Sequence, residues 1–431
     1  MLPVAVRFQA APGNAPNRAG PEQQDGFDAQ GQTIRLDITQ GPQAAGAMAW
    51  AALAEGRHAL DIDASGLADP VALAAGATLR AWSPRPAPRG TLSIICEAPG
   101  MAARLWAKTW PCIAGNLFAR SLVVRPANDL TPAAFVQALQ TLSRHGLQVT
   151  VHDRAWLEHN GYGALSAVGR AAKSGPYLVT LHWLGEGPPI ALVGKGLCFD
   201  TGGISIKPAG GMEAMRADMA GAAACAGAML ALALGRTPRA AVAVLAIAEN
   251  TTSADSYRPG DVLHTAKGLT VEVVDTDAEG RLALADALHH AITRHSPRAV
   301  LDAATLTGSI VTALGHHHGG LFSNDARLQS ATLAAGRAEG EPLWPMPIGE
   351  RHREDLKSAI ADLRQCMPAG LGRQPDACHA AAFLREFVGT TPWAHLDIAG
   401  MDLAEADNPL AAKGMPTGFG ARLFARLIQE Y

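Results

Sequence analysis

From Phe118 onward, short apolar runs typical of strands alternate with longer segments typical of helices. Strands that read as continuous apolar runs are buried on both faces, and helices that follow them can connect parallel neighbours. The alternation therefore predicts an α/β fold built on a mostly parallel, doubly wound sheet. The predicted strands are residues 177–183, 190–193, 240–247, 271–274 and 299–301, and the predicted helices are residues 216–234, 282–293 and 379–387.

The first part of the chain has a different character. Residues 1–108 mix short apolar stretches with turns rich in proline and glycine, and they contain no cluster of residue types that ligate metals. A chain of 431 residues is also long for a single hydrophobic core. We expect a small accessory α/β domain at residues 1–108 and a catalytic domain at residues 109–431.

Composition excludes several classes of protein. With a net charge of -3 and a pI near 6.6, the chain offers no electrostatic case for nucleic acid or a membrane surface as an obligate partner. The apolar run at residues 219–235 is short for a bilayer and predicts a buried helix. The six cysteines are scattered without a C-x-x-C pair, which predicts neither disulfide bonds nor a zinc ribbon. With no secretory signal at the amino end, the expected location is the cytoplasm.

Two segments that follow predicted strands carry the chemistry. Ligand sites in such sheets form beyond the carboxyl ends of strands, and residues 193–207 and 274–281 lie there. Asp277 and Glu279 are two positions apart, so in an extended chain their side chains face the same way, and Gly280 then permits a turn before the helix. Two carboxylates held together repel each other unless a cation lies between them.

The earlier segment supplies further groups. Lys195 and Asp200 are expected on either side of a glycine-rich bend, and Lys207 follows the pair Gly202-Gly203. Asp218 is expected at the start of a helix. Two divalent ions would balance the four carboxylates, which favours a two-metal site over a one-metal site; these are Asp200, Asp218, Asp277 and Glu279.

These segments resemble the leucyl aminopeptidase family. GKGLCFDTGGISIKP is similar to the first metal motif of that family, and DTDAEGRL is similar to the second, which normally has Asn where Asp275 stands. The resemblance covers roughly the last three hundred residues, and the two motifs together are specific. Shorter stretches that agree with the family are MRADMAGAA, ATLTG, HLDIAG and KGMPTGFG.

The resemblance implies a role for each ligand. Asp200 and Glu279 would bridge both ions, Asp277 would complete the shell of one ion, and Asp218 with the amine of Lys195 would complete the other. A lysine can ligate only when neutral, so the ions must lower its pKa far below the usual value of about 10.4. The ions implied are manganese or zinc, with cobalt and magnesium as alternatives, because an oxygen-rich cage with one amine accepts several metals.

A mechanism follows from these roles. A water that bridges the two metals becomes a nucleophile near neutral pH, while one metal polarises the scissile carbonyl. Lys207 would stabilise the oxyanion. The resemblance implies that Arg281, with backbone near Leu306, holds a bicarbonate that acts as general base. It also implies a pocket for the first side chain of the substrate, lined by Met215, Thr305 and Gly308.

The resemblance further implies peptide substrates with a free amino terminus and a homohexamer. Two alternatives stay open: another two-metal hydrolase of amides or esters that needs no free amine, and a regulatory or DNA-binding protein on the same fold. A merely structural metal site has no use for an oxyanion clamp or an anion-binding arginine. Lys207 and Arg281 therefore favour the enzyme, and the acidic net charge weakens the DNA hypothesis.

Other conspicuous residues have simpler interpretations. Adjacent histidines cannot all face one ion, so residues 316–318 predict an exposed loop. Cys198 and Cys225 have small apolar neighbours in the sequence and are expected to be buried. Gly194-Lys195 lacks the spacing of a phosphate loop. Asp402 is expected to add a negative charge to the wall of the substrate pocket.

Overall fold

The computed structural model describes residues 4–10, 23–27, 33–53, 59–85, 90–368 and 374–431. The chain forms two compact units, one made of residues 1–117 with 404–417 and the other of residues 118–403 with 418–431. Residue 108, where we expected a domain boundary, lies inside helix α3 (Pro99–Val123). A segment near the carboxyl terminus thus belongs to the first unit, an assignment that no local pattern in the sequence indicated.

The first unit is an α/β sandwich of one sheet with two closely packed helices. Helices α1 (Pro42–Leu53) and α2 (Pro70–Arg80) pack closely because both contribute glycine at the contact: a Cβ on Gly46 would lie 2.0 Å from the Leu73 carbonyl oxygen, and one on Gly76 would lie 1.7 Å from the Gln43 carbonyl oxygen. The strands, in sheet order, are β1 (Val4–Gln9), β5 (Gly90–Ile95), β4 (Ala59–Asp63), β2 (Gln23–Phe27) and β3 (Thr33–Asp37).

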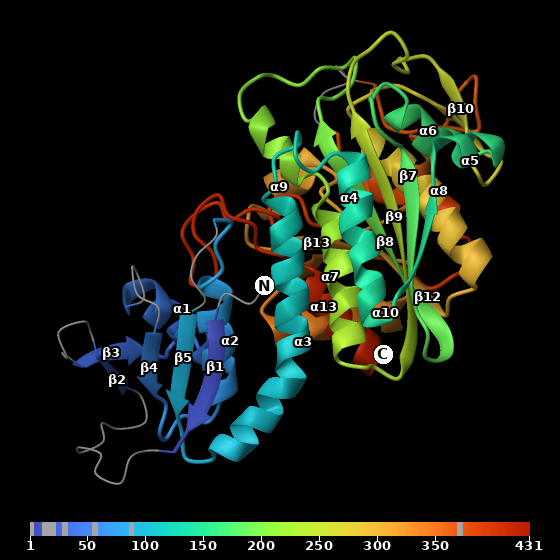
Figure 1. Ribbon diagram of the computed structural model, residues 1–431. Coiled ribbons are helices and arrows are strands. Elements are labelled where there is room, and N and C mark those ends of the chain that lie inside the picture. Colours follow the sequence, from blue (N-terminus) through green and yellow to red (C-terminus); the bar gives the residue numbers. More distant parts are fainter. Residues whose placement is uncertain (1–3, 11–22, 28–32, 54–58, 86–89, 369–373) are drawn as a thin grey trace. The chain divides into compact units, whose positions relative to one another are not determined.

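The second unit is built on an eight-stranded sheet whose four central strands are mutually parallel (Figure 1). Strands nearer the edges run antiparallel to their inner neighbours at three of the pairings. The predicted α/β fold with a mostly parallel sheet is therefore confirmed for the centre of the sheet. The strands, in sheet order, are β14 (Leu343–Pro345), β13 (Gly319–Ser323), β16 (Trp393–Asp397), β12 (Ala299–Ala304), β8 (Glu186–Asp200), β9 (Arg239–Asn250), β7 (Tyr177–Trp183) and β6 (Gln148–His152).

Helices cover both faces of this sheet, as its doubly buried strands require. Gly194 and Gly196 of β8 face helix α7 (Ala220–Leu234), where a Cβ on Gly194 would lie 2.5 Å from the Ala222 Cα. Alternate residues of β8 face helix α8 (Glu279–His295), on the other side in Figure 1. The remaining helices of the unit are α4 (Pro132–Gln140), η1 (Thr141–His145), α5 (Arg154–His159), α6 (Gly163–Gly169), η2 (Met212–Ala217), α9 (Gly308–Leu314), α10 (Ala326–Glu339), α11 (Glu350–Glu354), α12 (Asp376–Val388) and α13 (Ala421–Glu430).

Several predicted elements need correction. The strand predicted at residues 190–193 continues to Asp200, because the glycines that suggested a bend instead let α7 approach β8. Residues 271–274 are not part of the main sheet: β11 (Thr270–Glu272) pairs with β10 (Val262–His264) and β15 (Leu363–Arg364) in a separate small sheet. The helix predicted at 216–234 is divided into η2 and α7, and α8 begins at Glu279 rather than at Leu282.

Other predictions from composition are confirmed. The segment Met212–Leu234 is long and apolar enough to cross a membrane, but 94% of its most apolar window is buried inside the protein. It is therefore a core helix, as expected. None of the six cysteines, all of which lie in the described ranges, forms a disulfide bond, and Cys198 and Cys225 are buried.

Candidate metal centre and active site

All of the site residues predicted from the sequence line one cavity of about 670 Å³ in the second unit. The cavity lies at the carboxyl ends of β8 and β12 and at the amino end of α8, where an α/β sheet is expected to place a ligand site. The predicted residues that line it are Lys195, Asp200, Lys207, Met215, Asp218, Asp277, Glu279, Arg281, Thr305, Leu306 and Gly308.

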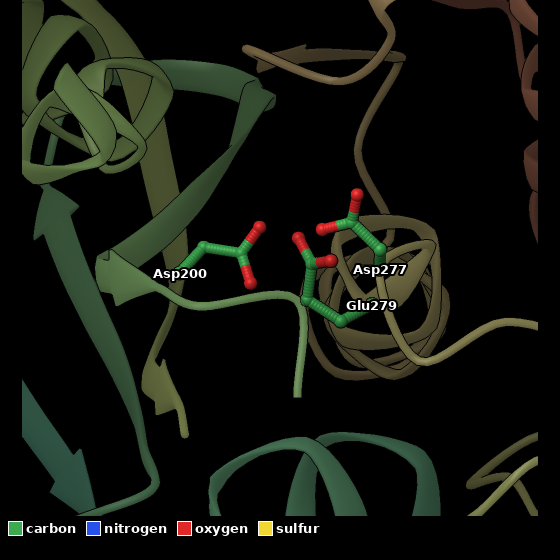
Figure 2. Close-up of side chains that lie close together, drawn as sticks. All are labelled: Asp200, Asp277 and Glu279. Atoms are coloured by element: carbon green, nitrogen blue, oxygen red, sulfur yellow. The ribbon is translucent and has the colours of Figure 1, made fainter. Parts of the chain in front are cut away.

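Three carboxylates converge in this cavity. Asp200 is the last residue of β8. Asp277 lies in the turn directly before α8, and Glu279 is the first residue of α8. One oxygen from each lies within 4.8 Å of the other two, and Figure 2 shows the three side chains facing one another. Asp277 and Glu279 are brought together by a turn into a helix, not by an extended chain as we expected. The group has the ligand types and spacing of a metal site.

Lys195 lies on the other side of Glu279. Its Nζ is 2.9 Å from Asp218 Oδ1 and 2.9 Å from Glu279 Oε1, and it donates a hydrogen bond to the Thr305 carbonyl oxygen at 3.0 Å. Gly280 makes room for this side chain, since a Cβ there would lie 2.7 to 2.8 Å from the end of Lys195. Gly280 therefore lies within α8, where it leaves room for the Lys195 side chain of β8. It does not form the turn we predicted.

Two carboxylate oxygens of this cluster are buried without a hydrogen-bond donor among the described residues. Within the described part of the chain, neither Asp218 Oδ2 nor Glu279 Oε2 has a hydrogen-bond partner. A buried carboxylate oxygen without a donor is costly, and a divalent cation removes that cost. The donor set of oxygens and one amine thus fits divalent ions.

The pKa values reflect the crowding. Burial and repulsion from Asp200 raise the pKa of Asp277 to about 7, and burial, reinforced by Asp200, raises the pKa of Glu279. Burial also raises the pKa of Asp218 well above its usual range. Burial favours the neutral amine of Lys195, but attraction to the carboxylates outweighs it and raises the pKa. Only added cations could therefore make Lys195 a neutral ligand.

Lys207 approaches the carboxylates from a more exposed position. Its Nζ is 2.8 Å from Asp200 Oδ2 and also contacts Asp277, and attraction to Asp200 and Glu279 overcomes burial and raises its pKa. The loop that carries Lys207 turns at Gly202 and Gly203, both with positive φ (85° and 64°), a conformation that favours glycine.

Sequence reasoning missed residues that hold the ligands in place. Asn250 Nδ2 donates to Asp200 Oδ1 at 2.7 Å and to the Thr276 carbonyl oxygen at 3.0 Å. Thr276 Oγ1 donates to the Gly202 carbonyl oxygen at 2.6 Å, which ties the two motifs together. Thr276 lies inside the second motif and could have been noticed. Asn250 ends β9, and its position at the carboxyl end of a predicted strand was the signal available.

Asp275, the departure from the family motif, has a local role. Its Oδ1 accepts a hydrogen bond from the Asp277 backbone N–H at 2.9 Å, which shapes the turn that carries Asp277. Asparagine offers the same acceptor, so the departure preserves this contact.

The two terminal nitrogens of Arg281 are engaged by the protein's own groups, whereas its buried Nε has no hydrogen-bond partner among the described residues. It donates through NH2 to Asp376 Oδ1 at 2.8 Å and through NH1 to the Gln365 carbonyl oxygen at 2.9 Å. The Leu306 backbone N–H, the other donor expected to hold bicarbonate, donates to Asp397 Oδ1 at 3.1 Å. No local pattern in the sequence indicated these partners, since Gln365 follows β15 and Asp376 begins α12, both far along the chain from Arg281.

The expected substrate pocket shares the cavity. Met215, Thr305 and Gly308 all line it, and Thr305 Oγ1 donates to Asp218 Oδ1 at 2.7 Å, which links the expected pocket to a candidate metal ligand. Asp402 lines the cavity too, and burial raises the pKa of its carboxyl. His316 and His317 are exposed in a turn, as expected.

Comparison with known proteins decides the family. Residues 117–425 match the model of the cytosol aminopeptidase family, catalytic domain. The chain belongs to this family. That match confirms the predicted resemblance and the predicted enzyme class, a metallo-aminopeptidase.

Individual relatives agree over most of the chain. A probable cytosol aminopeptidase of Cereibacter sphaeroides is 43% identical over 411 residues, which are 92% of this chain and 81% of the relative. A probable cytosol aminopeptidase of Brucella suis is 43% identical over 340 residues, 78% of this chain and 67% of the relative. Among solved structures, the bottromycin maturation enzyme BotP in complex with Mn is 32% identical, with a TM-score of 0.85 over 100% of this chain and 99% of that one.

Proposed function

We propose that this aminopeptidase uses two divalent ions to hydrolyse the amino-terminal bond of peptides. The observation that carries the proposal is the group of four carboxylates and a buried lysine around one cavity, with two buried carboxylate oxygens that have no donor among the described residues. One ion cannot reach all of these groups from the position between Asp200, Asp277 and Glu279, because Asp218 lies across Lys195. Two ions are therefore the simplest way to satisfy them.

The residues present fit such a pair. Asp200 and Glu279 would hold both ions, Asp277 would hold one, and Asp218 with Lys195 would hold the other. Bound divalent ions would polarise the scissile carbonyl and would lower the pKa of a bound water to about 7. Manganese or zinc is proposed, with cobalt and magnesium as alternatives; the similar BotP structure contains Mn.

The chain's own residues supply the rest of the site. Lys207 would hold no ion and, when protonated, can donate to the oxyanion that develops on the substrate carbonyl; attraction to Asp200 and Glu279 outweighs burial and raises its pKa. Met215, Thr305 and Gly308 border the space where the first side chain of the substrate would lie. A free α-amine could bind one of the ions, which would explain a preference for the amino end of a peptide.

The groups expected to hold bicarbonate are largely occupied by the chain itself. Arg281 NH2 is engaged by Asp376, and the Leu306 N–H is engaged by Asp397. The buried Arg281 Nε is the remaining donor of this guanidinium without a partner among the described residues.

We also propose, from the family resemblance, that the enzyme is a homohexamer in the cytoplasm. Analytical ultracentrifugation of the purified chain tests the hexamer: a sedimenting mass six times 44.8 kDa supports it, and a monomer contradicts it.

A substrate panel tests the proposed reaction. The chelated protein is assayed on free-amine dipeptides and aminoacyl amides, then again after each metal is restored, with amine-blocked versions of the same compounds as controls. We expect activity only with metal and only on free amines. Equal cleavage of the blocked compounds would favour a two-metal amide hydrolase of another kind, and activity that survives complete chelation would contradict the metal mechanism.

A further inference from the structure

A carboxylate that is not a candidate metal ligand stands at the wall of the cavity. Asp376 is the first residue of α12, and its Oδ1 lies 2.8 Å from Arg281 NH2. The two side chains differ in burial: that of Arg281 is 2% exposed, whereas that of Asp376 is 38% exposed. Both residues line the cavity that contains the metal centre. The carboxylate of Asp376, which pairs with the buried Arg281, is therefore accessible from the cavity.

The position of Asp376 is fixed from both sides. At the start of α12, the Ala377 backbone N–H donates to Ser309 Oγ at 2.7 Å, which attaches the helix to the segment that contains Gly308. Arg281 is held in turn by the Gln365 carbonyl oxygen. Arg281 also lies two residues after Glu279, so the arginine that holds Asp376 starts from the helical turn that carries a candidate ligand.

The other carboxylates of the cavity are committed elsewhere. Four are candidate ligands. Asp275 accepts the backbone N–H of Asp277, and Asp402 accepts backbone N–H groups of its own turn. Lys195 is itself a candidate ligand, and Lys207 is assigned to the oxyanion, so neither is available as the base. Among the described cavity residues, Asp376 is thus the carboxylate held by a cation outside the candidate metal shells.

A purely structural interpretation of Asp376 accounts for only part of this. An acidic residue in the first turn of a helix is favourable by itself, and a buried arginine needs an anion. Neither requirement explains why the carboxylate that neutralises Arg281 is open to the reaction cavity. Of the donors expected to hold an external bicarbonate, Arg281 NH2 is engaged by Asp376 and the Leu306 N–H by Asp397, while the buried Arg281 Nε has no hydrogen-bond partner among the described residues. The structure therefore supplies a carboxylate of its own where an external one was expected.

We propose that Asp376 is the general base of this aminopeptidase and that it replaces bicarbonate; the inference rests on the proposed function. As the oxygen of the attacking water forms its bond to the scissile carbonyl carbon, the Asp376 carboxylate accepts the proton that the water loses. The protonated Asp376 then gives this proton to the leaving nitrogen as the C–N bond breaks, which restores the carboxylate. Arg281 positions Asp376 throughout.

The test compares variants of the metal-loaded enzyme with and without bicarbonate. Asp376→Asn keeps an acceptor for Arg281 but cannot take a proton, and Asp376→Gly leaves space for an external anion. Asp355→Asn is the matched control, because Asp355 is an exposed carboxylate paired with His379 and does not line the cavity. Metal content is measured for every variant, and bicarbonate binding is measured by titration calorimetry.

We expect the unaltered enzyme to be equally active with and without bicarbonate and to bind none. Asp376→Asn should lose kcat by about 100-fold or more, the range of general-base catalysis, with KM and metal content unchanged. Asp376→Gly should bind bicarbonate and regain activity when it is added, and Asp355→Asn should behave like the unaltered enzyme.

Two results would overturn the inference: an unaltered enzyme whose rate falls when bicarbonate is removed, or an Asp376→Asn variant that keeps its full kcat. If Asp376→Gly does not fold, the kcat of Asp376→Asn decides. Failure of the proposed function would look different, since the unaltered enzyme would then hydrolyse no free-amine substrate with any metal.

Discussion

Lys195 and Lys207 contact the same group of carboxylates but differ in burial, with 3% and 20% of the side chain exposed. Because Lys207 is more exposed, it is available to a substrate. Its removal also leaves all the candidate ligands in place, since Lys207 is not one of them. We therefore predict that Lys207→Ala lowers kcat by about 100-fold or more, the cost of losing one oxyanion donor. Bound metal should stay nearly constant, which elemental analysis of the assayed sample measures.

The matched control for this prediction is Lys173→Ala, which removes an exposed lysine outside the cavity. It should leave both kcat and metal content unchanged. A loss of metal in Lys207→Ala that parallels the loss of activity would show that Lys207 organises the ligands and would contradict an oxyanion role.

Asp286 gives a pH-dependent prediction away from the candidate metal centre. Its carboxylate is buried in α8 and accepts the backbone N–H groups of Leu165 at 2.9 Å and Ala266 at 2.8 Å. Burial raises its pKa to about 7. The folded state therefore holds a proton that the unfolded chain, with a pKa of about 3.9, releases. Asp286 thus contributes stability at low pH, and this is lost as pH rises through the folded pKa.

Comparison with Asp286→Asn, which does not titrate, isolates this contribution. As pH falls from about 7 towards 4, the unfolding free energy of the unaltered protein should rise relative to the variant by up to about 1.4 kcal/mol per pH unit. Urea denaturation of both proteins across this range measures the difference. A difference that does not change with pH would contradict the raised pKa.

At the scale of elements, Gly280 lets helix α8 lie close to strand β8, because its missing side chain leaves room for that of Lys195. Alanine at this position suits a helix better than glycine, by about 1 kcal/mol, but its Cβ would lie 2.7 to 2.8 Å from the Lys195 side chain. We predict that Gly280→Ala lowers metal content and activity while the protein stays folded. Gly100→Ala adds the same methyl group to another helix where the nearest atom is 4.0 Å away, and it should change neither. Full metal occupancy in Gly280→Ala would contradict the packing argument.

The same glycines show what the sequence could and could not predict about the elements. Apolar runs placed β7, β9 and β12 well, because their burial is continuous. In β8 the glycines suggested a bend, and only the three-dimensional contact with α7 shows that they permit close packing within a strand. Residue types also indicated which groups gather in the cavity. Partners such as Asn250 and Asp376 could not be predicted, since their roles depend on pairings between distant segments.

At the scale of the whole molecule, every candidate metal ligand belongs to one of the two units, the one formed by residues 118–403 and 418–431. The other unit combines residues 1–117 with residues 404–417. Leu410, for example, packs with Leu79 and Ile113, although more than half of the sequence separates them. Because all the candidate ligands lie in one unit, bound metal should affect the stability of the two units differently.

We predict that divalent metal stabilises only the unit that contains the ligands. A ligand that binds the folded state alone adds about 2.7 kcal/mol when its concentration is 100 times Kd. Scanning calorimetry of the chelated chain should therefore show one transition that rises in temperature when Mn²⁺ is added and one that does not. Asp277→Ala should reduce the rise. Gly76→Ala, whose Cβ would lie 1.7 Å from the Gln43 carbonyl oxygen, should lower only the transition that metal leaves unchanged. Equal shifts of both transitions would mean that the two units unfold together, because metal bound in one could then stabilise the other.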